Sequence, residues 1–447
     1  MITQRYGDLE VGFVTNWRPL PIIDYFATAQ PPSGWYAPGS VCGYGKGKPW
    51  AEYGALVLKD RSSSGDLLKP PTDYKSVHSM GFYTVWRPVP PAGYVALGDV
   101  IWPGMDKPGA DARVACVKKT HGGRDYARRA ELSREPLLLG ESDSGPVWSY
   151  RAVLPPLYPD GDDAERLLLL AGTCSFGPGE EHAPTEVTWI LDVPAVVEKE
   201  DYRPELKLTS YEAPPELTVV VDRAVTVPYS MIVDTGRPET WKVAESPFYK
   251  ILRKRHYKLV RHVDYRGHGN GAIIEAIEQG VTKEESEEFS QVTGITTSFT
   301  TGVEAGGSFL GIGASARIET SVSTSVELGY SSRYSVQTFE SKTVSVSYNV
   351  PADYAGALWS DTHELTPVRG DGVIVTKERM LVHSGAYVGR TYPDTDGVAP
   401  NVSLVPTSEQ IETAKNAGID PEELPKLMAQ AQAELFTAPR PQRPAGD

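Results

Sequence analysis

The sequence predicts a mainly β protein, with two β-rich parts followed by a short helical tail. Its 447 residues include 42 glycines and 37 prolines, and helical periodicity is rare before the C-terminus. Strand and turn patterns recur in the N-terminal part, and a later stretch rich in Ser and Thr alternates between polar and apolar residues. We expect a pseudo-repeat, β-prism-like domain at 1–200, an elongated antiparallel β module at 201–405, and a helical or disordered tail at 406–447.

An internal repeat defines the N-terminal part. Repeated strand-and-turn units of this size predict a pseudo-symmetric β structure in which each copy forms one antiparallel sheet. A weaker third copy begins near Val147-Trp148 and includes 170–173. The segments that resemble one another are 12–21 with 81–90, and 31–41 with 90–100.

Four aromatic residues of this region have two interpretations. Large aromatic side chains are common in protein cores, and their rings also bind sugars or lipid headgroups when they are exposed. A purely structural role is the alternative to a binding role. The receptor-binding candidates are Trp17, Trp35, Trp86 and Tyr94.

The Trp-Arg-Pro and Pro-x-Gly-Tyr-x-x-Leu-Gly-Asp-Val elements resemble the vacuolar protein sorting-associated protein 62 family. The resemblance covers residues 6–194. The second copy of the repeat fits well, whereas the first has Pro38 where the family has Leu. The resemblance implies a module rather than a defined activity.

The most distinctive pattern lies in residues 292–330. Two arms alternate strictly between residue types, which places one set of side chains on each face of a strand. Each arm has the roughly nine to eleven residues that a tilted strand needs to cross a bilayer. The residues expected to face lipid are Ile295, Phe299, Val303, Ile318, Val322, Val326 and Leu328. The residues expected to line a pore lumen are Glu304, Arg317, Glu319 and Glu327.

A glycine-rich apolar tip joins the two arms. Phe309, Leu310 and Ile312 lie here, where an ordinary hairpin turn is polar. These three residues are expected to lead the insertion of the hairpin into a membrane. The alternative is an ordinary half-buried antiparallel sheet, which shows the same alternation. The polar Ser/Thr face and the apolar tip favour a transmembrane β-barrel.

The Ser/Thr-rich stretch, its Gly-Gly-Ser tip, Leu328-Gly329-Tyr330-Ser331 and the closing Val350-Pro351 resemble the aerolysin-like β-pore-forming toxins. The similarity is greatest to the epsilon-toxin and mosquitocidal-toxin class, and it covers residues 217–404. It implies a soluble toxin that binds a target-cell surface, oligomerises and inserts a β-barrel, with an insecticidal role suggested by the family alone. It also implies that the tail is an activation peptide; a frayed tail is the alternative.

A basic, aromatic stretch at 249–262 is unusual in this acidic chain. One interpretation is attraction to anionic headgroups or glycans. The alternative is a strand or helix face that pairs with nearby acidic residues, namely Glu284, Glu285, Glu287 and Glu288.

Composition excludes several classes of function. The net charge of −14 argues against a nucleic-acid partner. No apolar run reaches the length of a transmembrane helix. Cys42, Cys116 and Cys174 are widely spaced and are expected to be reduced core residues. No catalytic triad, phosphate loop or metal-ligand spacing is evident, so we expect no enzyme activity, no metal and no cofactor.

The expected partners follow from these interpretations. They are a target-cell membrane, a surface receptor (glycan, glycolipid or protein) and further copies of the chain in the pore; a second toxin component is a further open partner. The N-terminus lacks a signal-peptide h-region, so we expect synthesis in a bacterial cytoplasm and release toward the target. The rival class is a carbohydrate- or lipid-binding adhesion module that never inserts. Segments 408–417 and 421–435 predict two short helices.

Overall fold

The computed structural model describes two connected β-rich parts. The residues described are 1–19, 26–42, 54–79, 81–132, 137–142, 145–153, 166–178, 184–199, 204–279, 285, 288, 292–293, 342–377, 380–393, 400–404, 411–412, 415 and 420. The helical elements with assigned bounds in this part of the chain are α1 (Glu239–Glu245) and the 3-10 turns η2 (Ala110–Ala112), η5 (Thr185–Val187) and η6 (Tyr229–Met231). Antiparallel strands form most of the rest, which confirms the mainly β prediction. The predicted tail helices lie almost wholly outside the described residues.

Three small sheets in the N-terminal part share one apolar core. The first contains β3 (Trp17–Pro19), β4 (Phe26–Ala29) and β5 (Ser40–Cys42). The second contains β8 (Asp73–Ser79), β9 (Tyr83–Val89) and β11 (Val100–Pro103). The third contains β16 (Glu131–Leu132), β17 (Leu137–Ser142), β18 (Gly145–Val153) and β20 (Cys174–Gly177). All three sheets contribute to a buried cluster of Phe26, Tyr83, Val85, Ile101, Val147, Cys174 and Phe176.

Two of the repeat units contain the same turn. Gly34 has φ 77° and precedes Trp35, and Gly93 has φ 81° and precedes Tyr94. In each turn the backbone N–H of the aromatic residue donates to the carbonyl three residues earlier, over 3.1 and 3.0 Å. Glycine is favoured here because other residues rarely adopt a positive φ. The similarity predicted between 31–41 and 90–100 is therefore a structural one.

The other half of the predicted repeat is not structurally equivalent. Trp86 faces Val100 across the β9–β11 pair, and Ala27 faces Val41 across the β4–β5 pair. Ala27 is thus the counterpart of Trp86, whereas Trp17 lies one strand away on β3. The prediction that 12–21 corresponds to 81–90 is wrong, because strand register follows the residues that face the core rather than a short local motif.

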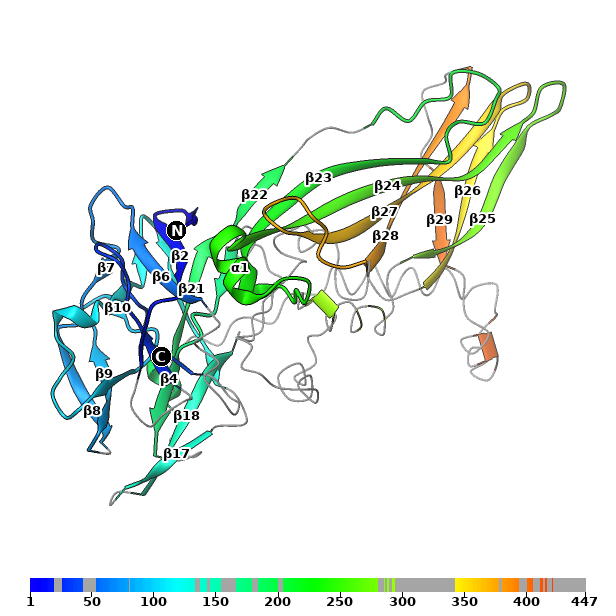
Figure 1. The fold of residues 1–447 in the computed structure, drawn as a ribbon. Helices are drawn as coiled ribbons and strands as arrows, with labels where there is room; N and C mark the ends of the chain where they lie inside the picture. The colour runs from blue at the N-terminus through cyan, green and yellow to red at the C-terminus, as the bar shows by residue number, and fades with distance from the viewer. Residues whose placement is uncertain are drawn as a thin grey trace.

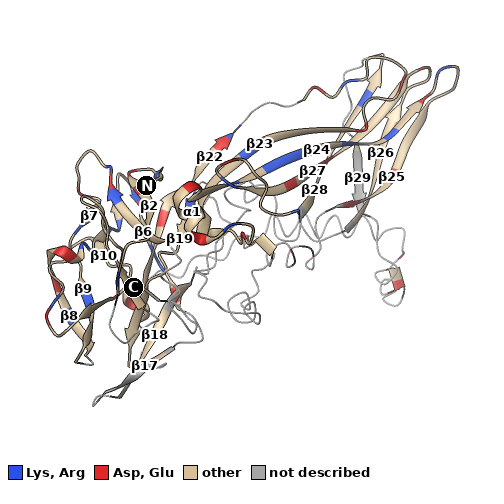
Figure 2. Ribbon diagram, viewed as in Figure 1, with Lys and Arg blue, Asp and Glu red and all other residues tan. Residues whose placement is uncertain are grey.

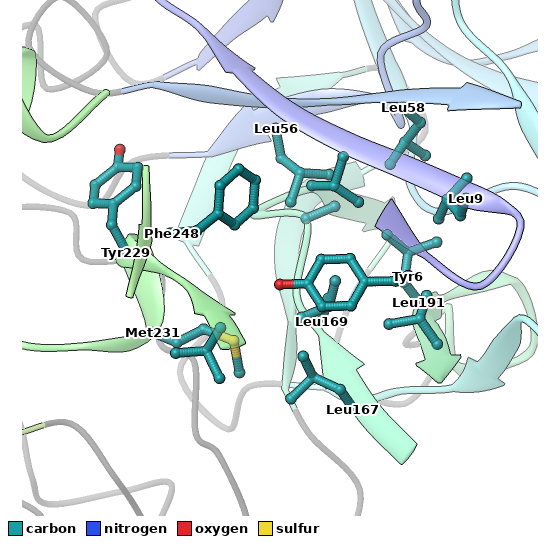
Figure 3. Packing of buried hydrophobic residues seen from close by; sticks show 14 of the residues in the cluster. Tyr6, Leu9, Leu56, Leu58, Leu167, Leu169, Leu191, Tyr229, Met231 and Phe248 are labelled. Carbon is teal, nitrogen blue, oxygen red and sulfur yellow. The ribbon is translucent and has the colours of Figure 1, made fainter. Parts of the chain in front are cut away.

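Further sheets of the N-terminal part connect it to the rest of the chain. They are β1 (Thr3–Tyr6), β2 (Leu9–Val14) and β6 (Ala55–Asp60); β15 (Ala127–Arg129), β21 (Trp189–Pro194) and β19 (Arg166–Leu169); β10 (Tyr94–Val95), β12 (Cys116–Lys118) and β7 (Leu68–Lys69); and β13 (Thr120–His121) with β14 (Arg124–Asp125). A large apolar cluster extends from these sheets across the boundary expected near residue 200. Figure 3 shows Tyr6 and Leu56 near Phe248. The rings of Phe13 and Tyr229 have centroids 4.9 Å apart, so one shared core joins the two parts.

The second part is an elongated β module that extends away from the N-terminal sheets (Figure 1). Its five-stranded sheet has the order β22 (Val196–Lys199), β23 (Leu217–Pro228), β24 (Phe248–Asp264), β27 (Ala355–Val368) and β28 (Met380–Tyr392). A three-stranded sheet has the order β25 (Gly271–Gln279), β26 (Lys342–Val350) and β29 (Asn401–Leu404). Every residue of β27 is buried, so this strand is covered on both faces.

Candidate functional site

The antiparallel pair β25–β26 flanks the predicted insertion segment in the sequence. β25 ends at Gln279, β26 begins at Lys342, and these two residues are cross-strand partners. The pairing continues in uninterrupted register to Gly271 and Val350 at the other end. Both ends of the intervening chain therefore leave the same end of one hairpin, side by side. An antiparallel extension of both strands can start here without breaking an existing pair.

Strand β26 has two chemically different faces. Its apolar face packs with Ile273 of β25 and Leu358 of β27, which fastens the small sheet to the large one. Alternation in burial along the strand separates the two sets of side chains. The buried set is Val344, Val346, Tyr348 and Val350, and the intervening set is Thr343, Ser345, Ser347 and Asn349. The base of the hairpin thus has the apolar and Ser/Thr faces that the sequence predicts for 292–330.

The residues predicted to act in the membrane fall outside the part of the chain that the structure describes. This applies to the lipid-facing set Ile295, Phe299, Val303, Ile318, Val322, Val326 and Leu328. It applies equally to the tip residues Phe309, Leu310 and Ile312 and to the lumen residues Glu304, Arg317, Glu319 and Glu327. Their roles stay predictions.

The four aromatic receptor candidates are buried. Trp17 and Trp35 belong to one apolar cluster, Trp86 to a second and Tyr94 to a third. Each side chain is only 7–8% exposed. Burial to this degree favours the structural role, and a binding role for these rings stays a prediction.

The basic stretch 249–262 lies on β24, in the middle of the long sheet (Figure 2). Its charged side chains meet carboxylates on β22, β23 and β27, so much of its charge is neutralised within the sheet. Arg253 binds Asp222 through two contacts of 2.8 and 2.5 Å, and both side chains are largely buried. The ion pairs include Lys250–Glu198, Arg253–Asp222, Lys254–Glu364 and Arg255–Asp361. Pairing with acidic residues agrees with the alternative interpretation, although these partners are not those predicted.

A histidine lies within this ionic cluster. His363 of β27 is 4% exposed, and its Nε2 atom lies 3.5 Å from Oδ1 of Asp361. Burial lowers the pKa of His363, and the contact with Asp361 only partly opposes this. Burial would raise the pKa of Asp361, but hydrogen bonds from His363 and Arg255 outweigh it, and the pKa is lowered. The cluster therefore combines an ionised carboxylate with a histidine that resists protonation.

A second ionic cluster fixes the end of the long sheet next to the N-terminal part. Arg369 donates from Nε and Nη2 to Asp234 over 2.6 and 2.8 Å, and the Tyr249 hydroxyl donates to the same carboxylate over 2.6 Å. Burial would raise the pKa of Asp234, but these hydrogen bonds outweigh it and lower the pKa to about 2. The cluster is a buried anchor, because Arg369 is only 7% exposed.

The cysteines differ from expectation. Cys174 is disulfide-bonded, whereas Cys116 is a free and buried thiol. The prediction that all three cysteines are reduced is therefore wrong for Cys174, because a pairing that depends on folding is not visible in sequence spacing. Burial raises the pKa of the Cys116 thiol to about 12, which makes it a poor nucleophile.

The described residues contain neither a metal-binding cluster nor a membrane-spanning helix. No group of three or more His, Cys, Asp or Glu side chains there is arranged to hold a metal ion. None of the helices in the described part of the chain combines the length and apolar character needed to span a membrane.

A known protein family and solved structures are similar to parts of this chain. Residues 21–132 match the family described as vacuolar protein sorting-associated protein 62, which confirms the resemblance seen in the sequence there. The chain is also similar to the structure of GNIP1Aa from Chromobacterium piscinae, with 16% identity over 38% of this chain and 33% of that one, and a TM-score of 0.27. It is similar to Cry35Ab1 with 11% identity over 85% of this chain and 93% of that one, and a TM-score of 0.28.

The chain spans only a third of the length of GNIP1Aa. No curated protein matches the sequence.

Proposed function

We propose that this chain is a pore-forming toxin that binds a target-cell surface, oligomerises and inserts residues 292–330 as a membrane-spanning β-hairpin. The observation that carries the proposal is the pairing of Gln279 with Lys342. It places both ends of the intervening chain, which contains the amphipathic segment, at one end of an existing hairpin, and in the proposed pore both strands lengthen from there.

The physical driving force is the satisfaction of backbone hydrogen bonds. In lipid every backbone N–H and C=O must be paired within the protein, and a closed barrel achieves this for strands. One chain supplies only one hairpin, so the barrel requires several copies in a ring. The amphipathic faces of β26 support the proposal, because they have the chemistry that the inserted arms require.

The proposal is tested by dye release from liposomes made with the total lipids of candidate target cells. The full chain is added with and without brief protease treatment, and detergent-resistant oligomers are followed on gels. We expect release together with a high-mass band. Binding without release or oligomers contradicts pore formation and favours a carbohydrate- or lipid-binding module that does not insert.

A charged residue introduced at the predicted tip tests the insertion step separately from binding and oligomerisation. Leu310→Asp should abolish dye release while binding and oligomers persist, because a buried carboxylate opposes the passage of the tip through the hydrocarbon core. The matched control is Val373→Asp, at an apolar residue 48% exposed in a turn of the β module. We expect the control to release dye like the unmodified chain. Normal release by Leu310→Asp would refute the assignment of the tip.

A further inference from the structure

A cleft lies where the N-terminal part meets helix α1. Its volume is about 1140 Å³, and its walls come from four segments of the N-terminal part and from α1. The lining includes Thr15, Asn16 and Arg18, then Asp111 of η2 with the following Arg113, and Val243 of α1. Ligand sites are usually concave, with apolar walls and a few convergent polar groups, and this cleft has both.

The cleft contains more positive than negative charge. Nη2 of Arg18 lies 2.9 Å from Oδ2 of Asp111, and the Arg18 guanidinium also stacks over Trp102 at 4.1 Å from the ring centroid. Arg113 donates from Nη1 to the carbonyl of Pro31 over 2.5 Å. A guanidinium has five N–H donors in a planar fork, so Arg113 retains donors for a ligand. The two arginines and one aspartate leave a net positive charge.

The backbone of Arg113 is in an unusual conformation. Its φ is 47° and its ψ is 43°, which is the left-handed region that favours glycine. Its carbonyl accepts a hydrogen bond from the backbone N–H of Ala37 over 2.8 Å, which helps hold the residue in place. Strained residues that the surrounding structure holds in place are concentrated at binding and catalytic sites. The backbone conformation therefore indicates a binding role for Arg113 independently of its charge.

We propose that this cleft binds an acidic oligosaccharide, one that carries a carboxylate or sulfate group. The guanidinium groups of Arg18 and Arg113 suit a planar or multidentate anion. The amide groups of Asn16 and Gln30 both donate and accept hydrogen bonds, as sugar hydroxyls require, and the exposed Pro32 offers an apolar surface in the same cleft.

The position of the cleft gives this binding a consequence. A saccharide held there touches both the N-terminal part and α1, so it lies at the junction with the module that carries the insertion segment. That the saccharide acts as a receptor rests on the proposed function. That the cleft binds the saccharide does not depend on it.

The test is isothermal titration calorimetry of the full chain, without membranes. The probes are 3′-sialyllactose for the carboxylate, a heparin-derived tetrasaccharide for the sulfate and lactose as the neutral comparison. We expect one or both acidic probes to bind and lactose to bind more weakly. Equal binding of lactose, or no binding of any probe, would overturn the proposal. Because no membrane is present, this outcome is independent of the dye-release result.

Three variants locate the binding. Arg113→Asn removes the charge and keeps a residue that tolerates the left-handed conformation, and it should weaken acidic-probe binding by about tenfold or more. Asp111→Asn removes the competing carboxylate and should strengthen it. Arg124→Asn, an exposed arginine on β14 outside the cleft lining, should leave it unchanged. Equal effects of Arg113→Asn and Arg124→Asn would place the binding elsewhere.

Discussion

Arg87 clamps Asp99 where the three N-terminal sheets meet. Nε and Nη2 of Arg87 contact the two oxygens of Asp99 at 2.9 and 2.8 Å, and Asp99 is 2% exposed. The backbone N–H of Phe176, from the third sheet, donates to the same carboxylate over 2.8 Å. At the corresponding place in the first unit, the hydroxyls of Thr28 and Ser40 lie 2.7 Å apart. One pseudo-symmetric position thus uses a buried ion pair in one unit and a hydroxyl pair in another.

Removing one partner of this pair should lower the free energy of unfolding. Arg87→Met leaves the carboxylate of Asp99 buried without its charge partner, which typically costs about 3–5 kcal/mol of unfolding free energy. Urea denaturation measures the loss. The control is Arg5→Met, which removes an ion pair with Asp8 on the surface and should cost at most about 1 kcal/mol. Similar losses for the two variants would show that the Arg87–Asp99 pair adds little.

Local patterns in the sequence predicted part of this fold well. The mainly β class and the glycine turns before Trp35 and Tyr94 follow from residue types that act over a few positions. The same local reasoning misplaced Trp17, because its motif resembles that of Trp86 while the two residues lie on different strands of their units. A short motif does not fix register when the core-facing residues differ.

Long-range contacts were beyond sequence reasoning. Asp234 and Arg369 are 135 residues apart, and nothing in either neighbourhood indicates the other. The cleft has the same origin, since Arg18 and Asp111 are brought together only by the fold. The insertion segment is predicted from its alternation alone, and the structure adds that the longer chain containing it leaves and rejoins one strand pair at Gln279 and Lys342.

Acid should weaken the anchor around Asp234. The pKa of Asp234 is lowered from 3.8 to about 2, so the folded chain binds this proton less readily than the unfolded chain. The stabilisation is therefore complete above about pH 4 and is lost as the pH falls toward 2. Asp234→Asn should lose roughly 2 kcal/mol at neutral pH and show a flatter stability profile between pH 4 and pH 2. Urea midpoints across that range test this, with Asp371→Asn, in an exposed turn, as the control.

His363 should make the β module sensitive to milder acid. Its pKa is lowered by burial, with Asp361 opposing and Arg253 and Arg255 adding to the shift. The unfolded chain therefore takes up this proton more readily, and the stability contributed by neutral His363 is lost as the pH falls below about 6.5. His363→Gln should reduce the fall in urea midpoint between pH 7 and pH 5, and His268→Gln, in an exposed turn, should not. An unchanged slope in His363→Gln would contradict the assignment.

An engineered disulfide between β25 and β26 should leave pore formation intact. Ala276 and Ser345 are cross-strand partners on β25 and β26, and such pairs have the Cα separation that a disulfide requires. In the proposed pore both strands lengthen from this base and stay paired there, so Ala276→Cys combined with Ser345→Cys should release dye at the same rate when oxidised or reduced. If insertion instead requires β25 and β26 to separate, the oxidised protein releases no dye until a reductant is added. Dye release is measured before and after reduction. It distinguishes extension of the paired strands β25 and β26 from a mechanism in which the two strands must first separate.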